Sequence, residues 1–300
     1  METVTVKSDR GKVYQVGMIS DAYKMGSASG KPITVPIYDE RYKAVLADNL
    51  MNRPRDDFDT IVMCTGERRT GKTTVCAQLA RTIDKDFSVG HMTFKLVDFN
   101  KVLSDNPYAE PDKGIYPQVV LDEAGFDLFS QNWMERIQRN MVKKFEVIGI
   151  KKQIVYLVLP HRDMLNKKLR EGMAQFWLDA VTWKGKRGLV EVCRGIPNKW
   201  HLDRYWAADA AFTFDSLDGV PWWDLYSTKK RTFVDAVAEE TEEAQDDSRS
   251  KTWLGQRDNL AKALYRITDM SHAQIAEETG LAVGTVHTIL RGTHKVASPI

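Results

Sequence analysis

A glycine-rich run near position 70 carries the residue types that bind phosphate. Its sequence, GERRTGKT over positions 66–73, matches the pattern G-x4-G-K-[ST]. Glycines let the backbone turn so that successive N–H groups face phosphate oxygens, and the N-terminus of a following helix adds positive charge. In such a loop the Lys72 ammonium would neutralise the β- and γ-phosphates, and the Thr73 hydroxyl would bind Mg²⁺. We therefore predict a site for ATP and Mg²⁺ formed by Gly66, Glu67, Arg68, Arg69, Thr70, Gly71, Lys72, Thr73 and Thr74.

An acidic pair, Asp122 and Glu123, follows an apolar run about 50 residues beyond the glycine-rich loop. We expect Asp122 to hold Mg²⁺ through water and Glu123 to act as the catalytic base that orients the attacking water. A strand that ends in Asp-Glu usually shows only that the strand has reached solvent. Here the pair indicates a nucleotide site because it follows the glycine-rich loop at this spacing. Because kinases of small molecules activate a substrate hydroxyl and do not need the second carboxylate, Glu123 favours hydrolysis.

Apolar runs and helical spacing predict the elements that position these residues. Runs that are apolar throughout are typical of parallel strands covered on both faces, and they occur at 60–64, 118–121 and 153–159. Helical spacing of apolar residues occurs at 73–82, 133–144 and 164–171. The alternation predicts an α/β fold, a P-loop NTPase with a mainly parallel sheet, to which a small all-α helix-turn-helix domain is added.

The residues before the P-loop are predicted to form an accessory segment, 1–55. Val4, Val6 and Val13 on either side of a polar turn predict a hairpin. A loop is expected over Gly26–Pro36, and a helix over Asp39–Met51 that stops before Arg53-Pro54.

The third apolar run ends in Pro160-His161. In P-loop ATPases with an acidic base, the strand beside the acidic pair often ends in a polar residue that senses the γ-phosphate. His161 is a candidate for this role and for part of the catalytic machinery. The alternative is a loop histidine without a special function.

The stretch from Asp122 to Arg170 resembles the FtsK–HerA superfamily of DNA-translocating ATPases, and within it the zonular-occludens-toxin-like ATPases of mobile elements. The pattern is DEAG at 122–125, a basic helix, Ile148-Gly149-Ile150 before a strand, and a Leu-x4-Arg segment at 165–170. The resemblance covers 59–185, and His161 departs from it because the larger translocases carry glutamine there. It implies a homo-oligomer, and a ring is one form of it. It also implies that Arg170 reaches a neighbouring subunit as an arginine finger. Arg139 is the rival candidate, and a surface arginine is the plain alternative.

Basic and aromatic residues gather in three further places. Lysines and arginines on one helical face would contact phosphates or simply be solvated, and they are Arg136, Arg139, Lys143 and Lys144, with Lys151 and Lys152 after them. The basic tip of a predicted hairpin, at 183–188, suits a nucleic acid backbone or plain solubility. Aromatic residues in 200–234 favour packing over stacking on bases, and they are Trp200, Tyr205, Trp206, Trp222, Trp223 and Tyr226.

Charge divides the chain into parts. The segment Glu239–Ser248 carries six acidic and no basic residues, so we predict a P-loop domain over 56–238, an acidic linker over 239–250 and a helix-turn-helix domain over 251–300. In the last domain Ser271–Gln274 forms a capping box, Ala276 is the small residue at the helix crossing, and Gly280 lies in the turn. The residues that would read a DNA groove are Thr285, His287, Thr288 and Arg291. Contact with a protein is the alternative for this unit.

Composition places the chain among cytoplasmic proteins, including those of a phage in its host. The 300 residues are 43% hydrophobic and 28% charged, and they contain neither a membrane-spanning run nor a signal-peptide pattern. The three cysteines, Cys64, Cys76 and Cys193, are scattered and at no metal spacing, and Cys64 and Cys76 are expected to be small core residues.

These features together predict an ATP-hydrolysing motor that acts on nucleic acid, most simply double-stranded DNA, in a phage or another mobile element. Two other functions fit the same residues. One is a switch in which the ATP state controls DNA binding without translocation. The other is an ATPase that acts on protein during virion assembly.

Overall fold

The computed structural model describes residues 1–26, 31–122, 149–165, 167–198, 204–237, 258, 260–262, 264–265 and 270–291. The chain divides into two compact units, Met1–Lys230 and Arg231–Ile300. Among the described residues, none of the helices is both long and apolar enough to cross a bilayer.

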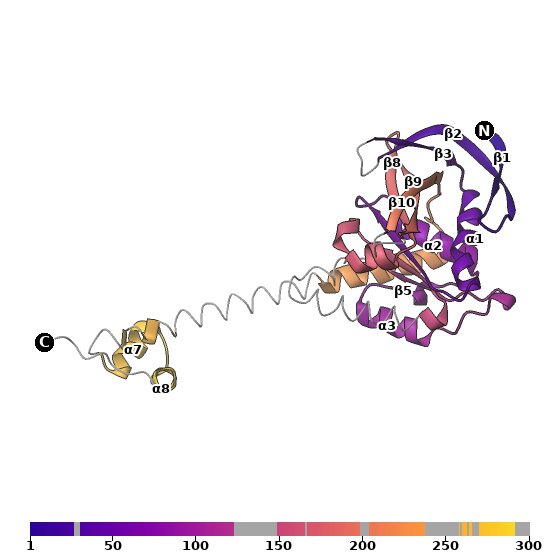
Figure 1. The fold of residues 1–300 in the computed structure, drawn as a ribbon. Helices are drawn as coiled ribbons and strands as arrows, with labels where there is room; N and C mark the ends of the chain where they lie inside the picture. The colour runs from indigo at the N-terminus through magenta and orange to yellow at the C-terminus, as the bar shows by residue number, and fades with distance from the viewer. Residues whose placement is uncertain are drawn as a thin grey trace. The chain divides into compact units, whose positions relative to one another are not determined.

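The first unit, drawn with its strands as arrows in Figure 1, is built on one ten-stranded sheet. The order of the strands is β1-β2-β3-β10-β9-β8-β4-β7-β6-β5. Its strands are β1 Glu2–Lys7, β2 Val13–Met25, β3 Ile33–Tyr38, β4 Thr60–Gly66, β5 Met92–Thr93, β6 Gln118–Leu121, β7 Ile154–Val158, β8 Phe176–Trp183, β9 Lys186–Pro197 and β10 Arg204–Thr213.

Five neighbouring strands, β8-β4-β7-β6-β5, are parallel to one another. They include the three strands expected from apolar runs, and β7 lies between β4, which leads into the P-loop, and β6, which leads into Asp122. Parallel strands end at the same edge of a sheet, and ligands of α/β proteins bind at that edge. The fold is therefore mixed α/β with a parallel half that brings Gly66, Asp122 and His161 to one edge.

The other half of the sheet is mostly antiparallel. The predicted hairpins β1–β2 and β8–β9 are present, whereas β3 occupies part of the expected loop Gly26–Pro36 and β10 was not expected at all. The sequence did not predict β3 because Pro36 has no N–H to donate to a neighbouring strand, and proline therefore argues against a strand. The structure accommodates it where the β2–β3 register shifts, between the pairs Ser20↔Ile37 and Tyr23↔Val35.

Helices lead into the parallel strands or connect them. They are α1 Tyr42–Arg55, α2 Lys72–Ile83 and α3 Leu96–Asp105, with the short turns η1 Val89–His91, η2 Pro111–Lys113, η3 Gly149–Lys151, η4 Arg162–Met164 and η5 Lys168–Met173. A further helix covers residues 221–237, and the predicted helix 133–144 lies outside the described residues.

Two helix predictions were wrong in detail. α1 continues through Pro54, although the expected end was before Arg53. Proline removes the N–H that would bond the carbonyl of Leu50, and the hydroxyl of Thr60 donates to that carbonyl instead, at 3.0 Å. The expected helix over 164–171 is a 3₁₀ turn, η4, followed by a π-helical turn, η5. Short turns of this kind are common as connectors, and helical spacing alone does not distinguish them from an α-helix.

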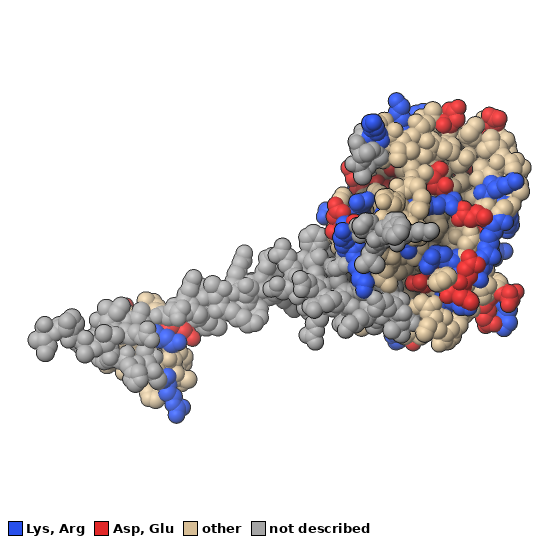
Figure 2. All heavy atoms as spheres, in the orientation of Figure 1, with Lys and Arg blue, Asp and Glu red and all other residues tan. Residues whose placement is uncertain are grey.

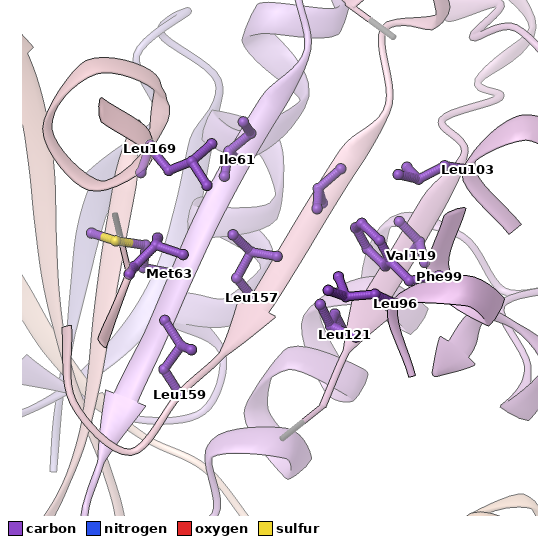
Figure 3. Close-up of a cluster of buried hydrophobic side chains, with 13 residues drawn as sticks. Ile61, Met63, Leu96, Phe99, Leu103, Val119, Leu121, Leu157, Leu159 and Leu169 are labelled. Carbon is purple, nitrogen blue, oxygen red and sulfur yellow. The ribbon is translucent and has the colours of Figure 1, made fainter. Parts of the chain in front are cut away.

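Alternate residues of the parallel strands form the main core (Figure 3). Ile61 and Met63 of β4, with Leu157 of β7, lie on the face that packs against α3 through Leu96 and Phe99. The intervening residues of each strand point to the opposite face, where α2 contacts β4, β6 and β7. The sheet is thus covered on both sides, and this burial fixes the strand ends that carry the polar site residues.

The second unit contains α7 His272–Thr279 and α8 Val283–Leu290. The predicted capping box at Ser271 and Gln274 is present, and Gly280 ends α7 with a left-handed φ of 63°. Ile275, Ala276, Val286 and Leu290 are buried together with Ala261. The two helices therefore pack through the small and apolar residues that the sequence pattern places there.

Candidate nucleotide-binding site

The P-loop connects the end of β4 to the start of α2 in a conformation that requires its two glycines. Gly66 and Gly71 have φ of 137° and 96°. A Cβ at Gly66 would lie 2.2 Å from the carbonyl oxygen of Ala180, and one at Gly71 would lie 2.7 Å from the ring of Phe214. Backbone conformation and close packing together exclude larger residues from both positions.

Lys72 and the first turn of α2 supply positive charge at this loop. The first N–H groups of a helix have no partner within the helix and attract anions. The Lys72 ammonium donates to the carbonyls of Gly66 and Glu67 at 2.9 and 2.6 Å. The Thr70 hydroxyl donates to the same Glu67 carbonyl at 2.9 Å. The lysine thus lies against the loop whose phosphate ligand it would neutralise.

Thr73 and Asp122, the two predicted metal ligands, are in direct contact. The Thr73 hydroxyl donates to the Asp122 carboxylate at 2.9 Å. Asp122 is buried, and its N–H donates to the carbonyl of Thr93 in β5 at 2.8 Å. A hydroxyl beside a buried carboxylate offers the oxygen ligands that Mg²⁺ prefers, so these residues fit the metal. The predicted base, Glu123, lies outside the described residues.

Two residues that were not predicted complete the surroundings of Asp122. The Tyr226 hydroxyl donates to its second carboxylate oxygen, and the Lys230 ammonium lies 2.8 Å from the same oxygen. Both residues come from the helix over 221–237. Positions 223, 226 and 230 share one helical face, and Pro221 is a typical first residue of a helix. These signals could have predicted the helix and the face that it buries, although not that this face contacts Asp122.

His161 and Arg170 lie near the site edge but are engaged within their own segment. The His161 ring accepts a hydrogen bond from the Asp163 N–H at 3.2 Å, and the side chain is exposed. The preceding carbonyl, of Pro160, accepts from the Gly66 N–H at 3.4 Å, which places this turn beside the P-loop. Arg170 pairs with Asp163 and, at 3.0 Å, with Glu171. The predicted roles of both residues stay predictions.

Part of the predicted basic surface serves the fold. The Lys151 ammonium donates to the carbonyl of Asn106 at 2.7 Å, and Lys152 pairs with Asp57. The rest of that cluster, Arg136, Arg139, Lys143 and Lys144, lies outside the described residues. At the β8–β9 tip Lys184 and Gly185 form the turn with positive φ, and the Lys184 ammonium lies 4.4 Å from the centre of the Trp183 ring. Lys184 thus contacts its own hairpin.

The predicted aromatic cluster is divided between two elements. Tyr205 and Trp206 belong to β10, whereas Trp222, Trp223 and Tyr226 belong to the helix over 221–237. Trp200 lies outside the described residues. Trp223 and Tyr226 are buried and stack with ring centres 4.5 Å apart, as the sequence favoured, whereas Tyr205 is exposed.

A partly buried polar cluster includes Thr65 of β4. The Thr65 hydroxyl donates to Asp179 at 2.6 Å, and the cross-strand neighbour of Asp179 is Glu191. The Tyr23 hydroxyl donates to Glu191 at 2.7 Å. Burial raises the pKa of Glu191 above its usual 4.5, and the charge of Asp179 raises this pKa further. The three cysteines are buried and free, as expected of Cys64 and Cys76.

The predicted DNA-reading residues lie on the exposed side of α8 and just after it. Thr285, His287, Thr288 and Arg291 are exposed, whereas Val286 and Leu290 are buried. The His287 ring contacts the His272 ring with centres 5.7 Å apart.

Comparison with known proteins gives little. No protein-family model matches the sequence, and no curated protein matches it. Among solved structures, the chain is similar to the flagellar accessory protein FlaH from Methanocaldococcus jannaschii, at 13% identity and a TM-score of 0.27. The match covers 54% of this chain and 96% of that one.

Proposed function

We propose that the chain is an ATPase that binds ATP and Mg²⁺ at the P-loop and hydrolyses ATP. The observation that carries this proposal is the contact between Thr73 and Asp122 at 2.9 Å. It brings the hydroxyl that follows the phosphate-binding lysine to the buried carboxylate of a different strand. Phosphoryl transfer needs this combination of anion-binding loop, cation and metal ligands at one point.

Each residue has a defined task in this proposal. The glycines shape the loop, the start of α2 and Lys72 bind the β- and γ-phosphates, and Thr73 with Asp122 would hold Mg²⁺. When bound, Mg²⁺ would neutralise charge on the β- and γ-phosphate oxygens. Glu123, the residue after Asp122, would orient the attacking water. His161, beside the P-loop, would sense the γ-phosphate.

We further propose that ATP hydrolysis drives work on double-stranded DNA. Support comes from the exposed residues of α8 and from a charge of +3 over residues 249–300, where seven basic residues face four acidic ones. On the face drawn in Figure 2, basic and acidic side chains of the first unit are interspersed. The DNA contact is therefore assigned to the second unit rather than to that face.

The same observations leave the alternative of an ATP-controlled DNA-binding switch, and that of an ATPase acting on virion protein. DNA that stimulates turnover would favour the motor. Stoichiometric, ATP-dependent DNA binding without stimulation would favour the switch, and no response to DNA would favour the protein-directed enzyme. In all three cases we propose a homo-oligomer, in which Arg170 or Arg139 reaches the neighbouring site.

The deciding experiment measures ATP binding and ATP hydrolysis, with and without double-stranded DNA. Lys72→Ala removes the phosphate-binding charge, so binding is expected to be lost. Glu123→Gln removes only the water-orienting carboxylate, so binding should persist while turnover stops. Lys85→Ala, at an exposed lysine beyond α2, is the control for the loss of one charge. Hydrolysis by Lys72→Ala at the wild-type rate would refute the proposal.

A further inference from the structure

The carboxylate of Asp122 is fully engaged by the protein itself. One oxygen accepts from Thr73, and the other accepts from Tyr226 and Lys230. The Asp122 side chain is 1% exposed and that of Lys230 is 31% exposed. A cationic side chain from a later helix thus contacts the carboxylate that the proposed function assigns to Mg²⁺, through the oxygen that Thr73 does not contact.

Independent contacts hold this helix over the ends of β5 and β6. The Lys229 ammonium donates to the carbonyl of Met92 in β5 at 2.7 Å. Tyr226 stacks on Trp223 and on Phe94, with ring centres 4.5 and 5.8 Å apart. The Arg81 guanidinium of α2 lies 4.8 Å from the centre of the Trp222 ring. The ion pair with Asp122 is therefore one contact of a docked helix segment.

We propose that residues 221–230 are a latch on the metal position, in which Lys230 supplies the positive charge that Mg²⁺ would supply. The inference rests on the proposed function. A buried carboxylate without a cation is costly, so Lys230 stabilises Asp122 while the site holds no metal. Two cations at one buried carboxylate repel each other, so Mg²⁺ with nucleotide would displace Lys230 and loosen the segment. Because the helix continues to residue 237, its release would act on the chain beyond Lys230.

The test compares the full-length wild type with Lys230→Met, Tyr226→Phe and the control Arg231→Met. Arg231 is the exposed basic neighbour of Lys230 in the same helix. Binding of ADP is measured by calorimetry at a series of Mg²⁺ concentrations. Amide hydrogen exchange of 221–230 is followed with ADP plus Mg²⁺ and with ADP plus EDTA.

The latch predicts that Lys230→Met lowers the Mg²⁺ concentration for half-maximal ADP binding by about tenfold. This is the change expected when Mg²⁺ no longer has to replace a hydrogen bond to a charged group. Tyr226→Phe should shift it the same way by less, and Arg231→Met should not shift it. In the wild type, exchange of 221–230 should accelerate with ADP plus Mg²⁺ and not with ADP plus EDTA. Tyr226→Phe keeps the ring stacks and decides the matter if Lys230→Met does not fold.

Two different failures can be told apart. If the wild type binds Mg²⁺ and ADP but Lys230→Met binds them equally or more weakly, the latch is wrong and the nucleotide function stands. Weaker binding would assign Lys230 to the phosphates instead. If none of the proteins binds ADP, the proposed function and the latch are both wrong.

Discussion

The hydroxyl of Thr73 lies 2.9 Å from the carboxylate of Asp122, which is 49 residues further along the chain. Thr73 comes after β4 and Asp122 comes after β6, and these two strands are not neighbours, because β7 lies between them. Thr73 bridges this distance from the first turn of α2. The contact therefore depends on parallel strands that end at one edge and on a helix that starts there, and it ties the two halves of the site together.

Replacing Asp122 by Asn should raise the Mg²⁺ concentration that nucleotide binding requires. The amide oxygen can still accept from Thr73, but the negative charge that attracts Mg²⁺ is lost. Changes in the surroundings of metal ligands weaken metal binding by about 10–100-fold, and loss of a charged ligand should cost at least as much. Calorimetry with ADP at several Mg²⁺ concentrations measures the change. Asp105→Asn, at an exposed aspartate of α3, is the matched control. If Asp122→Asn needs the same Mg²⁺ concentration as the wild type, Asp122 is not a ligand of the metal.

Gly66→Ala should abolish nucleotide binding and destabilise the fold. Both Gly66 and Gly114 have positive φ, at 137° and 72°, but only Gly66 packs against backbone, with 2.2 Å between its Cβ position and the oxygen of Ala180. The carbonyl cannot move cheaply because β8 is paired on both sides. We expect urea denaturation to give a loss about 2 kcal/mol greater for Gly66→Ala than for Gly114→Ala. Equal losses would show that the close approach does not constrain the loop.

The parallel half of the fold was predictable because its signals are local. Three apolar runs gave β4, β6 and β7, and G-x4-G-K-[ST] placed the loop between a strand and a helix. The antiparallel half was only partly predictable. β3 contains a proline, and β10 alternates weakly, with intermediate burial over much of its length. Their places depend on pairing with distant strands, which local periodicity does not report.

The site divides in the same way. Lys72, Thr73 and Asp122 follow from motif spacing, and the structure brings Thr73 and Asp122 together. Tyr226 and Lys230 could not be assigned, because their partner lies about 100 residues earlier and only the tertiary fold joins them. A helix face shows that a segment packs, not what it packs against.

Glu191→Gln should stabilise the protein at neutral pH. Burial raises the pKa of Glu191 above 4.5 in the folded state. The contribution of this carboxyl to the free energy of unfolding is therefore fully present below pH 4.5, and it is lost as the pH rises through the pKa of the folded state. Glutamine is neutral at all pH values and can still accept from Tyr23. Thermal unfolding should therefore give a higher Tm for Glu191→Gln at pH 7, with a difference that shrinks towards pH 4.5. Glu2→Gln, at an exposed strand position, should show no such trend. A lower Tm at pH 7 would contradict this account.

Arg170→Ala should reduce ATP turnover by about 10³-fold or more if the arginine acts as a finger in a neighbouring subunit. In the structure its side chain is 14% exposed and pairs with Asp163 and Glu171, so it must leave these partners to act. Mixing Arg170→Ala with Lys72→Ala should restore part of the activity, because some interfaces then combine an intact Lys72 with an intact Arg170. If subunits exchange without recovery, while Arg170→Ala lowers the free energy of unfolding, Arg170 only holds its own turn in place.

Arg291→Ala in the full-length chain should weaken binding to double-stranded DNA. Positions 285, 288 and 291 recur every third residue, and position 287 lies four residues before 291, so these exposed side chains share a side opposite the buried Val286 and Leu290. If Arg291 contacts phosphate, affinity should fall about equally for all sequences, and the slope of log affinity against log salt should drop by about 1. If it reads a base, the loss should be about 1–3 kcal/mol and confined to sequences that carry that base.

Lys7→Ala, at an exposed lysine of β1, controls for the loss of one positive charge. Low salt strengthens contacts between basic residues and phosphates. A wild-type chain that fails to bind DNA even at low salt would therefore show that the charge of +3 over 249–300 does not serve DNA binding, and it would assign this surface to a protein partner.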